Sequence, residues 1–209
     1  MSDELPVSVH AAGGPAPAGE GAMPAFYLDL ASPECYLTAE RILTLMPVAV
    51  EWIPVHLSPP PPGDAEREAI AATALARGIQ RVRWPPPFDG ELANLTATYA
   101  KSIGRTVAFA QAALRQAYAG GRDLSVSDNV IIAASGCEMH PNAVLKSVST
   151  RGVTATLATA TAIARDRGVL STPAIWIPPA GADAGPTGRV LHGDARLEDA
   201  AALLGERLG

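Results

Sequence analysis

Cysteine is scarce in this sequence, and long apolar runs are missing. Cys35 and Cys137 are the two cysteines among 209 residues. They are too few for a disulfide framework, and a chain of this length can bury a core without one. No uninterrupted apolar stretch is long enough to span a bilayer. Since 48% of the residues are hydrophobic and 18% are charged, we expect a globular protein with no membrane partner.

Positive charge is also in deficit. Lys and Arg number 16 against 21 Asp and Glu, which gives a formal net charge of −5. Nothing in this balance favours nucleic acid or an anionic membrane as a partner. Residues 1–24 lack the basic start and the apolar centre of a secretory signal. We predict a flexible leader there and a cytoplasmic protein, in which Cys35 would stay reduced.

Common catalytic and metal-binding motifs are absent. The sequence contains no Gly-x-Gly-x-x-Gly, P-loop, Gly-x-Ser-x-Gly or His-Glu-x-x-His pattern. Its histidines show no metal-ligand spacing among themselves or with the cysteines; they are His10, His56, His140 and His192. We therefore predict no metal site.

One segment joins a predicted strand to a predicted helix. Residues 25–30 alternate aromatic and aliphatic side chains, which is typical of a strand, and Ser32-Pro33 is typical of a helix start. The apolar pattern extends that helix to Met46. Backbone N–H groups and the positive end of the helix dipole converge at Ser32, so an anion such as a thiolate would be stabilised there.

Ser32 and Cys35 have the spacing of the redox motif Cys-x-x-Cys, with serine in place of the first cysteine. In that motif the first cysteine is the exposed nucleophile. A serine hydroxyl cannot take this role, but it can donate a hydrogen bond to the thiolate of another molecule. A plain helix cap followed by a buried cysteine would explain the same residues.

Strand signals recur only near the two ends of the chain. Three further strands are predicted, at 48–57, 174–177 and 188–192. The first of them would pair in parallel with 25–30, and Pro54 would place it at a sheet edge or bend it there. The last two would flank a hairpin loop at 178–187.

The stretch between these strands has a helical pattern from Asp64 to Arg167. The simplest assembly is one α/β domain formed by residues 25–60 and 168–209, with a helical insertion domain at 61–167.

Thr172-Pro173 directly precedes one predicted strand. The proline cannot donate to the sheet ladder. A cis peptide at this point would expose the Thr172 backbone to a ligand, such as an extended peptide or a thiol tripeptide. An ordinary trans proline that opens a strand is the alternative.

Together these segments resemble a known family. The order is strand, Ser-Pro-x-Cys-Tyr-Leu, strand, helical insertion, Gly-Val-x-x-Thr-Pro, hairpin and closing helix. This layout is similar to the DsbA-like branch of the thioredoxin superfamily. Within that branch it is most similar to the group with 2-hydroxychromene-2-carboxylate isomerase and kappa-class glutathione transferase.

The resemblance implies a fold and a site. It implies a thioredoxin-like α/β fold with an inserted all-helical domain, and glutathione or another low-molecular-weight thiol as cofactor. Ser32 would bond the sulfur, and Thr172 and Pro173 would hold the cysteinyl part. Asp194, one position before the family aspartate, would hold the γ-glutamyl end. Their positions in the sequence, apart from the resemblance, make His56, Trp84 and His192 candidate substrate-pocket residues. Strand-end packing of His56 and a proline-stiffened helix connection at Trp84 are the alternatives.

The sequence therefore leaves three candidate functions. The first is a thiol-dependent isomerase or transferase, in which Ser32 stabilises the cofactor thiolate that adds to an electrophilic small molecule. The second is a thiol-disulfide oxidoreductase that uses Cys35. The third is a non-catalytic member that binds a peptide or partner along the Thr172-Pro173 edge. A homodimer formed through the helical block is a further expectation.

Overall fold

The computed structural model describes residues 22–179 and 188–208. Most of the predicted leader and of the predicted hairpin loop lies outside these ranges. The described residues form a mixed sheet in the order β2-β1-β3-β4. Its strands are β1 (Ala25–Leu28), β2 (Glu51–Pro54), β3 (Ala174–Ile177) and β4 (Arg189–His192). β1 pairs in parallel with β2 and antiparallel with β3, so the prediction that Pro54 lies in an edge strand is confirmed.

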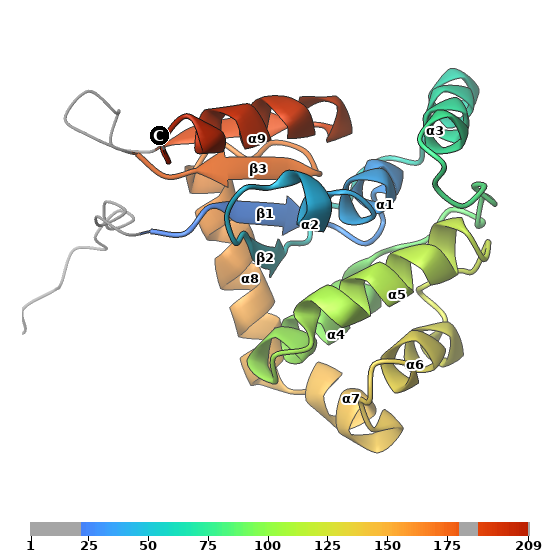
Figure 1. Cartoon of the computed structure of the whole chain (residues 1–209). Coiled ribbons are helices and arrows are strands. Elements are labelled where there is room, and N and C mark those ends of the chain that lie inside the picture. Colours follow the sequence, from blue (N-terminus) through green and yellow to red (C-terminus); the bar gives the residue numbers. More distant parts are fainter. Residues whose placement is uncertain (1–21, 180–187, 209) are drawn as a thin grey trace, which may run out of the picture.

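The helices are α1 (Pro33–Ala39), α2 (Ile42–Leu45), α3 (Asp64–Ala76), α4 (Glu91–Ser102), α5 (Thr106–Tyr118), α6 (Ser127–Ser135), α7 (Pro141–Val148), α8 (Arg151–Asp166) and α9 (Leu197–Gly205), with a short 3₁₀ turn η1 (Asp194–Arg196) before the last. Figure 1 shows α8 and α9 on opposite sides of the sheet, and α4 to α7 gathered as a group beside it. This group contacts the α/β part through α1 and β2. Among the described residues, no helix has the length and apolarity that crossing a membrane requires.

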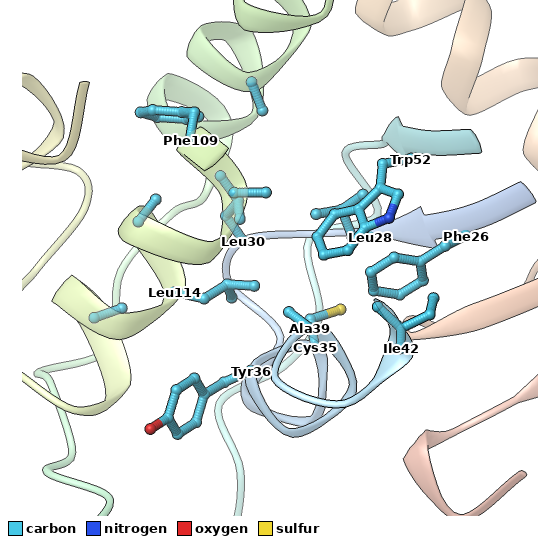
Figure 2. Packing of buried hydrophobic residues seen from close by; sticks show 14 of the residues in the cluster. Phe26, Leu28, Leu30, Cys35, Tyr36, Ala39, Ile42, Trp52, Phe109 and Leu114 are labelled. Carbon is cyan, nitrogen blue, oxygen red and sulfur yellow. The ribbon is translucent and has the colours of Figure 1, made fainter. Parts of the chain in front are cut away.

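The sheet buries both of its faces because successive side chains of a strand point to opposite sides. Phe26 and Leu28 pack on the face that α1 and α9 cover, where Phe26 meets the ring of Trp52 edge-on at 4.9 Å. Tyr27 and Trp176 pack on the other face with α8. Figure 2 shows the first of these clusters, in which Leu30 and Leu114 of α5 extend the core toward the helical insertion.

The predicted helix from 33 to 46 is interrupted. α1 ends at Ala39, and α2 begins at Ile42 after a turn. The Gln111 side chain of α5 donates a 2.9 Å hydrogen bond to the Ala39 carbonyl, which satisfies an acceptor that the helix leaves free. Arg41, in the turn, points to Glu198 of α9. Tertiary contacts thus end α1 after seven residues, and the predicted strand at 48–57 likewise shortens to β2.

Alanine dominates the contact between the helices of the insertion. α4 and α5 pack against each other, and the fully buried positions on them include Ala93, Ala97, Ala100, Ala110, Ala113 and Ala117. Small side chains let two helix backbones approach closely, so little free volume remains between them. The helical block is therefore a rigid support for the segments that precede and follow it.

Candidate functional site

Ser32 and Thr172 meet at the start of α1. Ser32 occupies the N-cap position with an extended backbone, yet its hydroxyl does not cap the helix. The hydroxyl instead donates a 2.8 Å hydrogen bond to the Thr172 carbonyl oxygen. The Thr172–Pro173 peptide bond is cis. The structure thus brings the two segments together, and the serine does not act as the plain helix cap that was the alternative.

The Thr172 hydroxyl lacks a partner in this arrangement. Its Oγ1 is buried, and among the described residues no group satisfies it. Buried polar atoms are normally hydrogen-bonded, because an unsatisfied one costs about 1–3 kcal/mol. Ser32 and Thr172 are only 3% and 9% exposed, so solvent does not compensate. A buried donor without a partner beside the Ser32 hydroxyl is the signature expected of a ligand site.

Cys35 lies below this point, in the core. It is 0% exposed, and Figure 2 shows its sulfur on the side of Phe26 and Ile42. Burial raises the pKa of the Cys35 thiol to about 12, and this outweighs hydrogen bonding with the Asp29 backbone and the Ser32 hydroxyl, which lowers it. A reactive cysteine needs an exposed and acidic thiol, and Cys35 has neither property. The geometry therefore opposes its candidate role as a nucleophile.

Asp194 already has partners. Its Oδ1 accepts a 3.1 Å hydrogen bond from Thr38 of α1, and its Oδ2 pairs with Arg77, just after α3. Arg41 lies 3.7 Å from Oδ1. The side chain is 4% exposed, so all its neighbours come from the protein. Asp194, the residue expected to bind a γ-glutamyl amine, is therefore already paired with Arg77 and close to Arg41.

Glu34 stands between this cluster and the cis-proline segment. Its carboxylate lies close to Gly193, whose N–H bonds to the Pro173 carbonyl at 2.8 Å. Burial raises the pKa of Glu34, hydrogen bonding to the Asp194 backbone lowers it, and the Asp194 charge raises it. The net direction is upward, so Glu34 keeps its proton to a higher pH than a free glutamate does.

An apolar pocket opens on the other side of Ala31, the residue before Ser32. Its cavity volume is about 80 Å³. Its wall consists of two proline-rich segments and the end of α5, contributed by Ala31, Pro59, Pro61, Pro62, Arg67, Trp84, Pro85, Pro86, Pro87, Phe88 and Tyr118. Tyr118 donates a 2.7 Å hydrogen bond to the Ala31 carbonyl, and the Arg67 guanidinium lies 5.4 Å from the Trp84 ring centroid. Trp84 therefore lies where a substrate-pocket residue is expected.

The two candidate histidines have different surroundings. His56 lies 3.1 Å from Ser58 and 3.6 Å from Asp89 through its Nε2 atom. Both of these neighbours line a second, larger cavity of about 310 Å³ that also includes Ala31. His192 in β4 instead accepts a 3.1 Å hydrogen bond from the Leu170 N–H and lines neither pocket. The part of the chain described by the structure contains no group of three potential metal-ligating side chains.

Asp29 is the main site residue that the sequence analysis missed. It is fully buried, and its carboxylate accepts hydrogen bonds from the N–H groups of Ala31, Leu57 and Ser58 and from the Asn94 side chain. The sequence does carry a signal for Asp29. It is a carboxylate at the end of an apolar strand, and such a group must find hydrogen-bond donors when it is buried. Tyr118 had no comparable signal, since its position depends on how α5 docks.

The sequence can now be compared with known proteins. The family model for the DSBA-like thioredoxin domain matches residues 25–205. The chain belongs to this family. None of the curated proteins matches the chain. The predicted fold class, a DsbA-type thioredoxin-like α/β fold with a helical insertion, is confirmed.

Solved DsbA-like structures agree with this assignment. A 2-hydroxychromene-2-carboxylate isomerase matches with a TM-score of 0.74 and 16% identity, over 90% of this chain and 96% of that one. A probable DsbA oxidoreductase from Streptomyces coelicolor gives 0.72 and 17%, over 90% of each chain. The cytosolic disulfide reductase DsbM from Pseudomonas aeruginosa, solved with GSH, gives 0.65 and 15%, over 90% and 99%. At these identities the likeness shows the fold of this DsbA-like protein, and its activity must be argued from the site.

Proposed function

We propose that this DsbA-like protein is a thiol-dependent isomerase or transferase. The observation that carries the proposal is the buried Thr172 hydroxyl without a partner, next to the Ser32 hydroxyl and the cis Thr172–Pro173 bond. In this proposal the Ser32 and Thr172 hydroxyls hold the sulfur of a low-molecular-weight thiol. An apolar, electrophilic small molecule lies in the pocket beside Ala31.

The two hydroxyls contribute differently. Ser32 must give up its bond to the Thr172 carbonyl before it can donate to a thiolate, whereas the Thr172 hydroxyl breaks no bond when it donates. A hydrogen bond to a charged group is worth about 1.5–3 kcal/mol. Since one pKa unit corresponds to about 1.4 kcal/mol, one such bond lowers the pKa of a bound thiol by about one to two units. The thiol is then more often ionised, and its thiolate is the nucleophile.

Asp194, at the far end of the proposed site, affects which thiol can bind. Glutathione is one candidate, and the DsbM structure with GSH shows that this fold can hold it. In this chain a γ-glutamyl ammonium would have to compete with Arg77 for Asp194. The residues therefore fit the sulfur end of glutathione better than its amino end, and another low-molecular-weight thiol remains in the proposal.

The remaining parts of the proposal are expectations from the sequence. The partner is a small molecule, the compartment is the cytoplasm, and a homodimer would form through the helical block. Size-exclusion chromatography with light scattering tests the dimer. The other two candidate functions differ in support. Buried Cys35 gives no support to disulfide exchange. Peptide binding at the Thr172 edge is one outcome of the test below.

The test measures thermal stabilisation by thiols. The wild type is heated with glutathione, cysteine, N-acetylcysteine or coenzyme A, beside Ser32→Ala and Thr172→Val. A ligand that binds only the native state raises the melting temperature, and we expect at least one thiol to do so. Thr172→Val removes an unpartnered hydroxyl at nearly constant shape, so it should hold or raise the stability of the free protein yet reduce the shift.

The matched control is Thr96→Val, another buried threonine, whose hydroxyl bonds to the Leu92 carbonyl within α4. This variant should keep the full thiol shift. The proposal is overturned if no thiol stabilises the wild type, or if Ser32→Ala and Thr172→Val respond as Thr96→Val does. A shift produced only by extended peptides would support the binding member instead.

A further inference from the structure

A separate cavity lies where α4, α8 and β2 contact one another, and Figure 1 shows α8 next to β2. Its volume is about 460 Å³, which is within the range of about 300–1,000 Å³ that is usual for small-molecule sites. Its lining includes three charged residues and several aliphatic ones, among them Glu51, Ile53, Lys101, Ala160, Ile163 and Arg167. It shares no lining residue with the two pockets beside Ala31, so it is distinct from the proposed thiol site.

Arg167, directly after α8, is a half-buried cation in this lining. Its guanidinium lies over the Trp176 ring, 3.7 Å from the ring centroid, and it donates a 2.7 Å hydrogen bond to the Tyr27 hydroxyl. Burial raises the pKa of Tyr27, so this hydroxyl is neutral near pH 7. Within the described parts of the chain, no carboxylate pairs with the guanidinium. An arginine has five N–H donors, so donors remain for an anion that enters the cavity.

The charges of the lining determine which anion fits. Lys101 pairs with Glu51, and its Nζ atom also donates a 3.4 Å hydrogen bond to the Trp52 carbonyl. These two charges offset each other, so Arg167 leaves the lining with one net positive charge. A monoanion balances this charge, whereas a phosphate dianion would exceed it and would be repelled by Glu51. A carboxylate also matches the planar guanidinium fork, which can bind both of its oxygens.

The aliphatic part of the lining determines what the anion is attached to. Ile163 of α8 is 38% exposed although it is a large apolar side chain, and Ile53 of β2 is half-buried. Ala160, Ile163 and Arg167 follow one another at spacings of three and four residues, which places them on one face of α8. An aliphatic chain bound along this face would remove apolar surface from water, which is favourable.

We propose that this cavity binds a small aliphatic monocarboxylate, whose carboxylate pairs with Arg167 and whose chain lies against Ile163 and Ile53. The stretch of α8 from Ala160 to Arg167 is about 10 Å long at about 1.5 Å per residue, which suits an acid of about six to eight carbons. The inference is independent of the proposed thiol-dependent function, because neither Ser32 nor Thr172 lines this cavity.

The test follows the methyl signals of Ile53 and Ile163 by NMR in protein labelled with ¹³C at its isoleucine methyl groups, while hexanoate is added. Ile53→Val and Ile163→Val identify the two signals. We expect both signals to shift and saturate with one dissociation constant. Hexan-1-ol keeps the chain without the charge, and acetate keeps the charge with almost no chain, so each should bind at least about tenfold more weakly. Equal affinity for hexanoate and either of these probes, or tighter binding of inorganic phosphate, would overturn the assigned ligand class.

Two variants test the position of the site. Arg167→Gln removes the cation, so hexanoate should bind at least about tenfold more weakly. Arg165→Gln is its matched control, since Arg165 is an exposed arginine of α8 outside the lining, and it should bind hexanoate as the wild type does.

Arg167→Gln also removes the partner of the buried Tyr27 hydroxyl, so a second variant keeps that bond. Ile163→Glu places a carboxylate in the cavity at a position that is already partly exposed, and repulsion should abolish hexanoate binding. Its control is Ala162→Glu, which adds the same charge at an exposed position outside the lining and should retain binding.

Three results would overturn the proposal. They are unchanged Ile53 and Ile163 signals in the presence of hexanoate, equal hexanoate affinities of Ile163→Glu and Ala162→Glu, and loss of hexanoate binding in Ser32→Ala. The last result would place hexanoate at the thiol site instead. None of the three alters the thermal shift by thiols, so the proposed function and this inference fail or stand separately.

Discussion

Asp29 and Ser32 are three residues apart and have different roles. Asp29 stabilises the fold, and Ser32 lies at the proposed thiol site. Asp29 ties the loops after β1 and β2 to Asn94 of α4. The desolvation cost of its buried carboxylate is offset by the N–H donors around it. Ser32 is thereby held against Thr172, and its hydroxyl donates a hydrogen bond to the Thr172 carbonyl. Because the Asp29 network holds this segment in place, the Ser32 hydroxyl can exchange its bond to Thr172 for a bond to a ligand.

The pairing of Asp194 with Arg77 gives a prediction at the same scale. Arg77→Gln removes the cation that occupies Asp194 Oδ2. We expect a loss of about 1–3 kcal/mol in unfolding free energy, because a buried carboxylate loses a partner. We also expect tighter binding of glutathione relative to N-acetylcysteine, which has no free amine. Isothermal titration calorimetry and urea denaturation measure the two effects.

Arg81→Gln is the control for this variant, since Arg81 is exposed. It should change neither stability nor thiol preference. An unchanged ratio of glutathione to N-acetylcysteine affinity in Arg77→Gln would show that Asp194 does not face the amino end of the thiol.

At the scale of elements, the insertion is held by helices that meet through alanine. α4 and α5 present six fully buried alanines between them, and α5 also supplies Gln111 to the end of α1 and Tyr118 to the Ala31 carbonyl. The position of the α1 N-terminus therefore depends on how closely α5 can approach. Periodicity predicts these helices, but an alanine-rich stripe carries little information on which side faces the core.

Ala97→Leu tests this close packing. Ala97 of α4 is fully buried, so three added methyl and methylene carbons have no space, and overpacking costs about 1–3 kcal/mol. We expect a lower urea midpoint and a weaker thermal shift by thiols. The control is Ala69→Leu at an exposed position of α3, which should be nearly neutral. Equal stability of the two variants would show that α4 has room for larger side chains.

For the whole molecule, a buried thiol and two tyrosine hydroxyls share a raised pKa. Burial raises the pKa of Cys35 and of Tyr36 to about 12, and it raises the pKa of Tyr118 well above its ordinary value. A group with a raised folded-state pKa keeps its proton after the unfolded chain has lost it. The native state then binds more protons than the unfolded state, so stability falls as pH rises.

The prediction is a loss of stability between the ordinary thiol pKa near 9 and about pH 12. Each pH unit in this range removes about 1.4 kcal/mol of unfolding free energy for a group such as Cys35. Cys35→Ala should lower stability at pH 7 through the cavity it leaves, yet flatten the decline at high pH. Urea denaturation at pH 7 to 11 measures both slopes, and parallel curves for the two proteins would contradict the assignment to Cys35.

The site was only partly readable from the sequence. Ser32, Thr172 and Pro173 were identified through resemblance. Trp84 lines the pocket beside Ala31, whereas His56 contacts Ser58 and Asp89, which line the second cavity. His192 lines neither pocket, and Cys35 is buried in the core. The Arg77 partner of Asp194 is 117 residues away in the chain, and no local pattern reports such a contact.

Local chemistry in the sequence by itself determined the order of strands and helices, the helix start at Ser32-Pro33 and the edge position of Pro54. These features follow from backbone preferences and side-chain periodicity, which act over a few residues. The tertiary structure alone decided where α1 ends, that Asp194 is already paired and that Thr172 Oγ1 lacks a partner. Each of these depends on which distant donors and acceptors a buried group meets, and only the packed fold brings those groups together.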